Sequence, residues 1–184
     1  MEKSRKIYEG KSKIVYATDS PDFLIHFFKD EITCFNAAKR GTIEHKGTIN
    51  NYISAQIFEF LESQGIPTHY EKILNDREVL VKKVQMIPLE VIIRNIAAGS
   101  LCRIFRLEEG MRLPCSILEY SYKDDSMQDP LVNEYHIRAL KLATDEDLEI
   151  IKRYAFQIND LLTGFFLTLH IDLVDFKVEF GKFK

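Results

Sequence analysis

Charged and apolar side chains alternate in the segment 173–180, close to the end of the printed sequence. Successive side chains of a β-strand point to opposite faces, so Asp175, Lys177 and Glu179 are expected on one face and apolar side chains on the other. Neighbours in the charged row would lie roughly 6.5–7 Å apart. Two carboxylates beside an ammonium could hold a metal ion and an anionic ligand. A strand with one solvated face would account for the same pattern.

A second candidate site for anions follows a predicted strand at 89–95. Arg94 is expected near the end of this strand, and Ser100 is placed to cap a short helix that runs to residue 105. A guanidinium and the backbone donors at the start of a helix both attract anions. An ion pair between Arg94 and Glu90, together with an ordinary helix cap, is the alternative interpretation.

The residues Gly10, Lys11 and Ser12 resemble the end of a phosphate-binding P-loop. That motif needs a glycine five residues earlier, where this sequence has Arg5, so the P-loop interpretation fails. What remains is a hairpin turn in which Lys11 and Lys13 fall on one face and could cover nucleotide phosphates, as the glycine-rich loops of kinases do. Solvated lysines on a turn would explain the same residues.

The loop 123–130 begins with Lys123 and contains three aspartates, including Asp129. It could position a substrate that carries an amine, or it could be a solvated turn. The histidines show no spacing typical of a zinc site. The loop therefore remains a candidate without an assigned chemistry at this point.

The elements that must position these residues are predicted from periodicity and turn signals. An antiparallel meander is expected over 6–28, a helix over 47–63 from the recurrence of Ile49 and Ile53, and a strand over 78–84. A short stretch at 85–88 could be a hinge between two lobes. Thr144 and Asp147 resemble a capping box at the start of a long helix with a core-facing apolar stripe, which leads into the last strand.

Charge and cysteine usage restrict the class of protein. The 184 residues carry a formal net charge of −3, which argues against nucleic acid as a partner. No apolar run is long enough to span a membrane, and the first residues lack the apolar stretch of a signal peptide. The cysteines, at positions 34, 102 and 115, are odd in number and widely spaced. We therefore expect reduced thiols and a cytoplasmic protein without membrane partners.

Several blocks of the sequence, in order along the chain, closely resemble the SAICAR synthetase family, the phosphoribosylaminoimidazole-succinocarboxamide synthases of purine biosynthesis. The matching blocks are 8–13, 45–47, 87–100, 129–134 and 174–181. Multi-residue blocks in one order are far more specific than a single short motif. The resemblance covers the chain from about residue 8 to residue 181.

The resemblance implies an α+β fold of two lobes, related in plan to the protein kinases, with ATP in the cleft between them. Residues 1–86 would form an antiparallel-sheet lobe that binds the nucleotide, and residues 87–184 a larger α/β lobe that binds substrate and metal. Family members continue past the last strand, so the chain is expected to lack the family's C-terminal segment. A homo-oligomer is expected as well.

The resemblance also implies a reaction. ATP and Mg²⁺ activate the carboxylate of 5-amino-1-(5-phospho-D-ribosyl)imidazole-4-carboxylate (CAIR), and the amine of L-aspartate attacks the activated carbon. The products are SAICAR, ADP and phosphate, in de novo purine biosynthesis. Two other functions stay open: a catalytically dead scaffold that binds nucleotide, and a kinase-like phosphotransferase that acts on a hydroxyl.

The roles of individual residues follow from the resemblance alone. The residues that would contact ATP are Gly10, Lys11, Ser12, Lys13, Lys82 and Met86. The ribonucleotide would be gripped by Arg94 and Ser100, and magnesium would be bound by Glu179. The residues that would face the reacting carboxylate and the incoming aspartate are Lys123, Asp129, Asp175 and Lys177.

Overall fold

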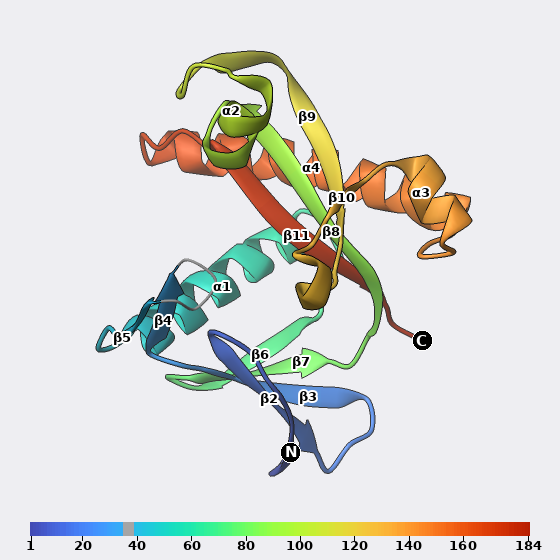
Figure 1. Cartoon of the computed structure of the whole chain (residues 1–184). Coiled ribbons are helices and arrows are strands. Elements are labelled where there is room, and N and C mark those ends of the chain that lie inside the picture. Colours follow the sequence, from blue (N-terminus) through green and yellow to red (C-terminus); the bar gives the residue numbers. More distant parts are fainter. Residues whose placement is uncertain (35–38) are drawn as a thin grey trace. The chain divides into compact units, whose positions relative to one another are not determined.

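The computed structural model describes residues 1–34 and 39–184, and the chain divides into two compact units (Figure 1). The first unit comprises residues 1–84 together with 183–184, and the second comprises residues 85–182. Each unit combines an antiparallel sheet with helices, as an α+β fold requires. Among the described residues, the helices are too short or too polar to cross a membrane.

The first unit contains a five-stranded antiparallel sheet in the order β1-β2-β3-β7-β6. Its strands are β1 (Lys3–Glu9), β2 (Lys13–Thr18), β3 (Phe23–Phe28), β6 (Tyr70–Asn75) and β7 (Glu78–Lys82). The expected meander and the strand near residue 80 are therefore confirmed. A separate hairpin pairs β4 (Glu31–Cys34) with β5 (Lys39–Thr42).

Helix α1 (Lys46–Ser63) packs against this sheet at the predicted place, but through a different face. Ile49 and Ile53, whose recurrence predicted the helix, are 55% and 52% exposed. The buried positions include Gly47, Asn51 and Ala55. A Cβ at Gly47 would lie 2.5 Å from the carbonyl oxygen of Phe28, so only glycine permits this close approach.

The second unit is built on a four-stranded antiparallel sheet in the order β10-β9-β8-β11. Its strands are β8 (Gln85–Ile96), β9 (Arg112–Tyr122), β10 (Leu131–Val132) and β11 (Asp175–Lys182). Its helices are α2 (Gly99–Phe105), the short 3₁₀ turn η1 (Asp125–Met127), α3 (Glu134–Ala139) and α4 (Asp145–Thr168). Residues 85–88, the possible hinge, form the first residues of β8. The boundary between the two units lies just before them, between residues 84 and 85.

Helix α4 begins with the predicted capping box. The Thr144 hydroxyl accepts a hydrogen bond from the Asp147 amide at 3.1 Å, and the Asp147 carboxylate accepts one from the Thr144 amide at 3.1 Å. Reciprocal bonds of this kind satisfy amide groups that the helix leaves unpaired at its start. The apolar stripe of α4 then packs with buried side chains of β8 and β9 in the core of the unit.

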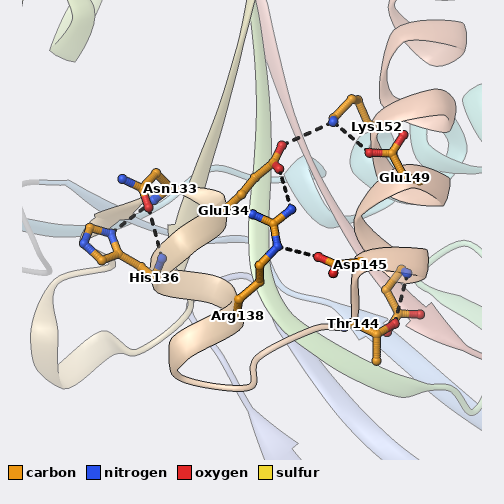
Figure 2. A network of polar contacts seen from close by, with 9 residues as sticks. Asn133, Glu134, His136, Arg138, Thr144, Asp145, Glu149 and Lys152 are labelled. Carbon is orange, nitrogen blue, oxygen red and sulfur yellow. Dashed lines mark hydrogen bonds and ion pairs between the residues drawn. The ribbon is translucent and has the colours of Figure 1, made fainter.

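Helix α3 is fastened to the start of α4 by a polar network (Figure 2). Arg138 lies 3.0 Å from Glu134 on its own helix and is also paired with Asp145 of α4. Lys152 bridges Glu134 and Glu149 at 3.2 and 3.1 Å. The network is partly exposed to solvent, so it orients the two helices and contributes little to stability.

Strand β11 alternates as the sequence predicts. Phe176, Val178 and Phe180 pack on the core formed with α4, while Asp175, Lys177 and Glu179 lie on the other face of the strand. On β8 the same alternation buries Leu89, Val91 and Ile93 and turns Glu90 and Arg94 the other way. The sheet of the second unit therefore has one apolar face under α4 and one charged face.

Candidate functional site

Strand register concentrates the charges of the second unit on three adjacent strands. Asp175 of β11 pairs with Arg94 of β8, and Glu179 pairs with Glu90. Between these two pairs, Ile92 of β8 pairs with Lys177 of β11 on one side and with Glu119 of β9 on the other. We call this surface the charged sheet face. It consists of Glu90, Arg94, Glu119, Lys123, Asp175, Lys177 and Glu179.

Arg94 is the buried hub of one half of this face. The residue is 8% exposed, and its Nε donates to Glu119 Oε2 at 2.7 Å while Nη1 donates to Asp175 Oδ2 at 3.2 Å. Nη2 donates to the Ser100 hydroxyl at 2.9 Å, so Arg94 and Ser100 lie together. The alternative prediction of an ion pair between Arg94 and Glu90 is wrong, because the guanidinium of Arg94 pairs with the carboxylates of Glu119 and Asp175.

Ser100 does not cap its helix. Helix α2 begins at Gly99, and its N-cap residue is Ala98, which makes no side-chain capping bond. The hydroxyl of Ser100 accepts from Arg94 instead. The expected helix is present, but the cap prediction was wrong because Ser100 is the second residue of the helix and its hydroxyl accepts from a charged donor nearby.

Glu90 is the buried hub of the other half. It is 5% exposed, and its Oε1 accepts from Lys177 Nζ at 2.7 Å and from Lys123 Nζ at 3.1 Å. Lys123 Nζ also lies 2.9 Å from Glu179 Oε1. One carboxylate that is almost wholly enclosed therefore holds two ammonium groups that remain half exposed.

Burial and hydrogen bonding act in opposite directions on the ionisation of this cluster. Burial by itself raises the pKa of Glu90, but hydrogen bonds from Lys177 and Lys123 outweigh it, and the pKa lies below its usual value. For Lys123, burial alone lowers the pKa, and hydrogen bonds to Glu179 and Glu90 reverse this and raise it. Glu90 and Lys123 are therefore both charged at neutral pH.

Asp129 is held within its own loop rather than in the charged sheet face. Its Oδ1 accepts from the Asp124 amide at 3.0 Å, and its own amide donates to the Asp124 carbonyl at 3.2 Å. Gln128 and Asp129 have φ values of 61° and 48°, in the left-handed region that residues other than glycine seldom adopt. Such backbone strain costs about 1–3 kcal/mol at each position and tends to occur at functional sites.

The predicted nucleotide residues of the first unit lie on a hairpin turn, as expected. The Gly10 amide donates to the Lys13 carbonyl at 2.9 Å, which closes the turn between β1 and β2. Lys11 is exposed at its tip, and the backbone of Ser12 accepts from the Lys29 amide at 2.8 Å. The turn thus offers an exposed ammonium on a backbone that is fixed on both sides.

Lys82 belongs to the first unit and Met86 to the second. Lys82 ends β7, and its Nζ donates to the Thr68 carbonyl at 3.2 Å. Met86 lies in β8, half exposed. The contact between Lys82 and Thr68 fixes the ammonium near the end of the first unit's sheet.

The sequence did not predict the role of Glu119 in the charged sheet face or the pairing of two histidines in the first unit. Glu119 was missed because no strand was predicted over β9, whereas the alternation of β8 had already placed Glu90 beside Arg94. His26 and His69 were also missed, and their rings lie 5.8 Å apart in the first unit. Burial, with a contribution from the charge of Lys13, lowers the pKa of His26 to about 3 and that of His69 to about 4.

The charged sheet face can stabilise negative charge and still accept new ligands. Glu90 and Glu119 are enclosed and serve to hold the cations, whereas Asp175 and Glu179 are partly exposed. Fixed cations in a partly desolvated site neutralise charge that develops during a reaction. Among the residues that the structure describes, no three metal-ligating side chains form a ready-made site.

Comparison with known proteins identifies the family. The family model described as SAICAR synthetase matches residues 6–184. The chain belongs to the SAICAR synthetase family. The phosphoribosylaminoimidazole-succinocarboxamide synthase of Caldanaerobacter subterraneus subsp. tengcongensis is 56% identical over 182 residues, which are 99% of this chain and 77% of that relative. The synthase of Lachnoclostridium phytofermentans is 51% identical over 183 residues, covering 100% and 78%.

Solved structures of SAICAR synthetases share the fold. The crystal structure of the synthase from Ehrlichia chaffeensis aligns with a TM-score of 0.95 at 47% identity and covers 98% of this chain and 76% of that chain. A SAICAR synthetase in complex with ADP aligns with a TM-score of 0.91 at 40% identity, covering 95% and 74%. The predicted family and fold class are therefore confirmed.

Proposed function

We propose that this chain is an ATP-dependent ligase that joins L-aspartate to the carboxylate of CAIR and forms SAICAR, ADP and phosphate in de novo purine biosynthesis. The observation that carries the proposal is the 56% identity, over 99% of the chain, with a relative named phosphoribosylaminoimidazole-succinocarboxamide synthase. The charged sheet face supplies fixed cations beside partly exposed carboxylates, which suits a reaction between anionic substrates.

The nucleotide is assigned chiefly to the first unit, whose boundary lies at residue 84 where the sequence analysis expected residue 86. One of the related structures was determined with ADP bound, which supports ATP as the co-substrate. The exposed Lys11, with Lys13, would cover its phosphates from the turn at Gly10 and Ser12. Lys82 and the backbone near Met86 would contact the rest of the nucleotide.

Magnesium is assigned to Glu179. The carboxylate is partly exposed and accepts from Lys123 through one oxygen, so further lone pairs are open to a ligand. Mg²⁺ takes oxygen ligands, keeps several waters and binds through one or two carboxylates together with substrate phosphates. One carboxylate therefore fits such an ion, which when bound would neutralise phosphate charge during transfer.

Lys123 and Lys177 are assigned to the reacting groups. A carboxylate is a poor electrophile at neutral pH, so its oxygen must first become a good leaving group, and phosphorylation achieves this. The two ammonium groups, aimed by Glu90, would offset the negative charge of the carboxylate and of the phosphorylated intermediate. Asp129 and Asp175 would orient the amine of the incoming L-aspartate.

Arg94 and Ser100 are assigned to the ribonucleotide. Three of the five N–H donors of a guanidinium are engaged by Glu119, Asp175 and Ser100, which leaves two for a phosphate oxygen. Ser100 is only partly buried, so its hydroxyl marks the side from which a ligand would reach the buried Arg94. The existing bonds hold the guanidinium plane in advance, which lowers the entropic cost of binding.

Cellular location and assembly belong to the same proposal. A cytoplasmic enzyme agrees with free thiols at Cys102 and Cys115, while the side chain of Cys34 lies outside what the structure describes. A homo-oligomer is proposed from family resemblance, and sedimentation of the purified chain would test it. A monomer at all concentrations would contradict this part alone.

The decisive experiment measures ADP release by the purified chain with Mg²⁺-ATP, CAIR and L-aspartate, omitting each in turn. We expect release that requires all three. ATP binding without turnover dependent on aspartate would favour a nucleotide-binding scaffold. ADP release with an alcohol and without aspartate would favour a kinase-like phosphotransferase instead.

A further inference from the structure

A pocket with both polar and apolar walls lies in the second unit, beside helix α4 and away from the charged sheet face. Its volume is about 470 Å³, within the range of roughly 300–1,000 Å³ typical of sites for small molecules. The first residues of β9 form one wall, the segment of α4 from Asn159 to Thr163 forms another, and Asn95 of β8 lies at its base. None of these residues takes part in the proposed ligase chemistry.

Hydrogen bonds fix the orientation of the two asparagine amides in this pocket. Asn95 lies 3.2 Å from the carbonyl oxygen of Leu173 and 2.8 Å from Asn159. A backbone carbonyl only accepts, so the atom of Asn95 beside it must be the donor Nδ2. The same Nδ2 faces Asn159, which must therefore present its oxygen to Asn95. The remaining acceptor of Asn95 takes the Ser116 hydroxyl at 2.7 Å.

This orientation leaves the Nδ2 group of Asn159 aimed away from Asn95. Asn159 is 5% exposed and lines the pocket, and the part of the chain that the structure describes offers its Nδ2 no hydrogen-bond acceptor. Nδ2 is not among the enclosed polar atoms without a partner, so it faces the open space of the pocket. A donor that is fixed in orientation and faces a pocket is placed to bind an acceptor of a ligand that enters it.

The other walls define the chemistry of that molecule. Arg112 lines the pocket with a mostly exposed guanidinium, which uses Nη2 to pair with Asp172 at 2.8 Å and has further donors. Thr163 adds a hydroxyl, and Leu113 and Pro114 add apolar surface. We infer that this pocket binds a small carboxylic acid, with its carboxylate on Asn159 Nδ2 and Arg112 and its carbon skeleton against Leu113 and Pro114.

Benzoate is a suitable probe because it combines a single carboxylate with a compact apolar ring. We expect saturable changes in the side-chain amide resonances of Asn159 in the ¹⁵N-labelled chain, with a Kd of about 1 mM. Benzamide has nearly the same shape without the charge, and should bind at least about tenfold more weakly, a ratio worth about 1.4 kcal/mol. Benzoate should also slow alkylation of Cys115, which lines the pocket, but not of Cys102.

Two neighbouring variants should change affinity in opposite directions. Asn159→Asp keeps the acceptor for Asn95 but removes the donor and adds a negative charge, so benzoate binding should fall at least about tenfold. Asp160→Asn removes an acidic group from the same wall and should tighten binding by about two- to threefold. Circular dichroism would confirm that both variants remain folded.

The benzoate experiments test the pocket separately from the ligase activity. It would be overturned if benzoate produced no saturable change at Asn159, or if benzamide bound equally well. It would also be overturned if a folded Asn159→Asp variant bound benzoate as tightly as the unchanged chain. In each of these cases, ADP release with the three substrates would be unaffected.

Discussion

The charged sheet face contains two clusters built on the same strands with opposite polarity. In one, buried Arg94 holds the carboxylates of Glu119 and Asp175, and in the other, buried Glu90 holds the ammonium groups of Lys123 and Lys177. The arginine partner Glu119 is itself enclosed, whereas both lysine partners of Glu90 are half exposed. The first cluster encloses most of its charge, and the second presents two ammonium groups to solvent.

Exchanging each hub for a neutral residue tests this difference most strongly. Arg94→Met leaves the enclosed Glu119 carboxylate unpaired and should lower the free energy of unfolding by about 3–5 kcal/mol. Glu90→Gln keeps an acceptor and leaves only half-exposed lysines, so its cost should be about 1–2 kcal/mol. Urea unfolding followed by circular dichroism measures both. Equal losses would show that the two clusters do not differ in this way.

The exposed partners of the Glu90 hub should matter for turnover more than for stability. Lys177→Met removes one fixed cation and should lower kcat by about 10²–10³-fold. Glu90 keeps Lys123 as a partner, so the free energy of unfolding should fall by only about 1 kcal/mol. Lys182→Met, on the same strand and paired with Asp147, is the matched control and should retain activity. A Lys177 variant with unchanged ADP release would remove this residue from the catalytic assignment.

The first unit contains partly buried groups of another kind, the neutral imidazoles of His26 and His69. Their pKa values are lowered to about 3 and about 4, against about 6.5 in an unfolded chain. The unfolded state therefore binds more protons below pH 6.5, and stability that is complete above that pH is lost as the pH falls towards 4. We expect a loss of about 2–4 kcal/mol for the pair by pH 5.

Urea unfolding of the double variant His26→Gln/His69→Gln isolates this contribution. Its stability should change little between pH 6.5 and 5, where most carboxylates remain ionised. An equally steep acid loss in the double variant would show that these two imidazoles are not its origin. The comparison separates the buried, paired charges of the second unit from partly buried imidazoles that stay neutral in the folded state.

The smallest effect is expected in the loop that carries Asp129. Gln128→Gly should relieve a left-handed backbone and raise the free energy of unfolding by about 0.5–1 kcal/mol. Met127→Gly, at the neighbouring position without a positive φ, is the control and should lower it by about 0.5–1 kcal/mol. Thermal denaturation of both variants checks the sign. Destabilisation by both would mean that the Gln128 backbone carries no strain.

The sequence by itself determined the features that depend on neighbouring residues. Alternation predicted the two faces of β11, the spacing of Thr144 and Asp147 predicted the start of α4, and the turn at Gly10 followed from residue types. These patterns reflect periodicity and capping over a few positions, so tertiary contacts seldom override them. The order of several multi-residue blocks along the chain also indicated the family, which one short motif could not have done.

The tertiary structure decided which charges meet. Arg94 contacts Glu119 and not Glu90, because register between β8 and β9 places residues far apart in sequence on neighbouring rungs. Contacts between separate elements likewise decide three other features. They are the bond of Ser100 with Arg94, the ring contact of His26 with His69 and the orientation of the Asn159 amide. Local periodicity gives the face of a strand, but only the packed sheet fixes the partner across it, since that partner is set by long-range register.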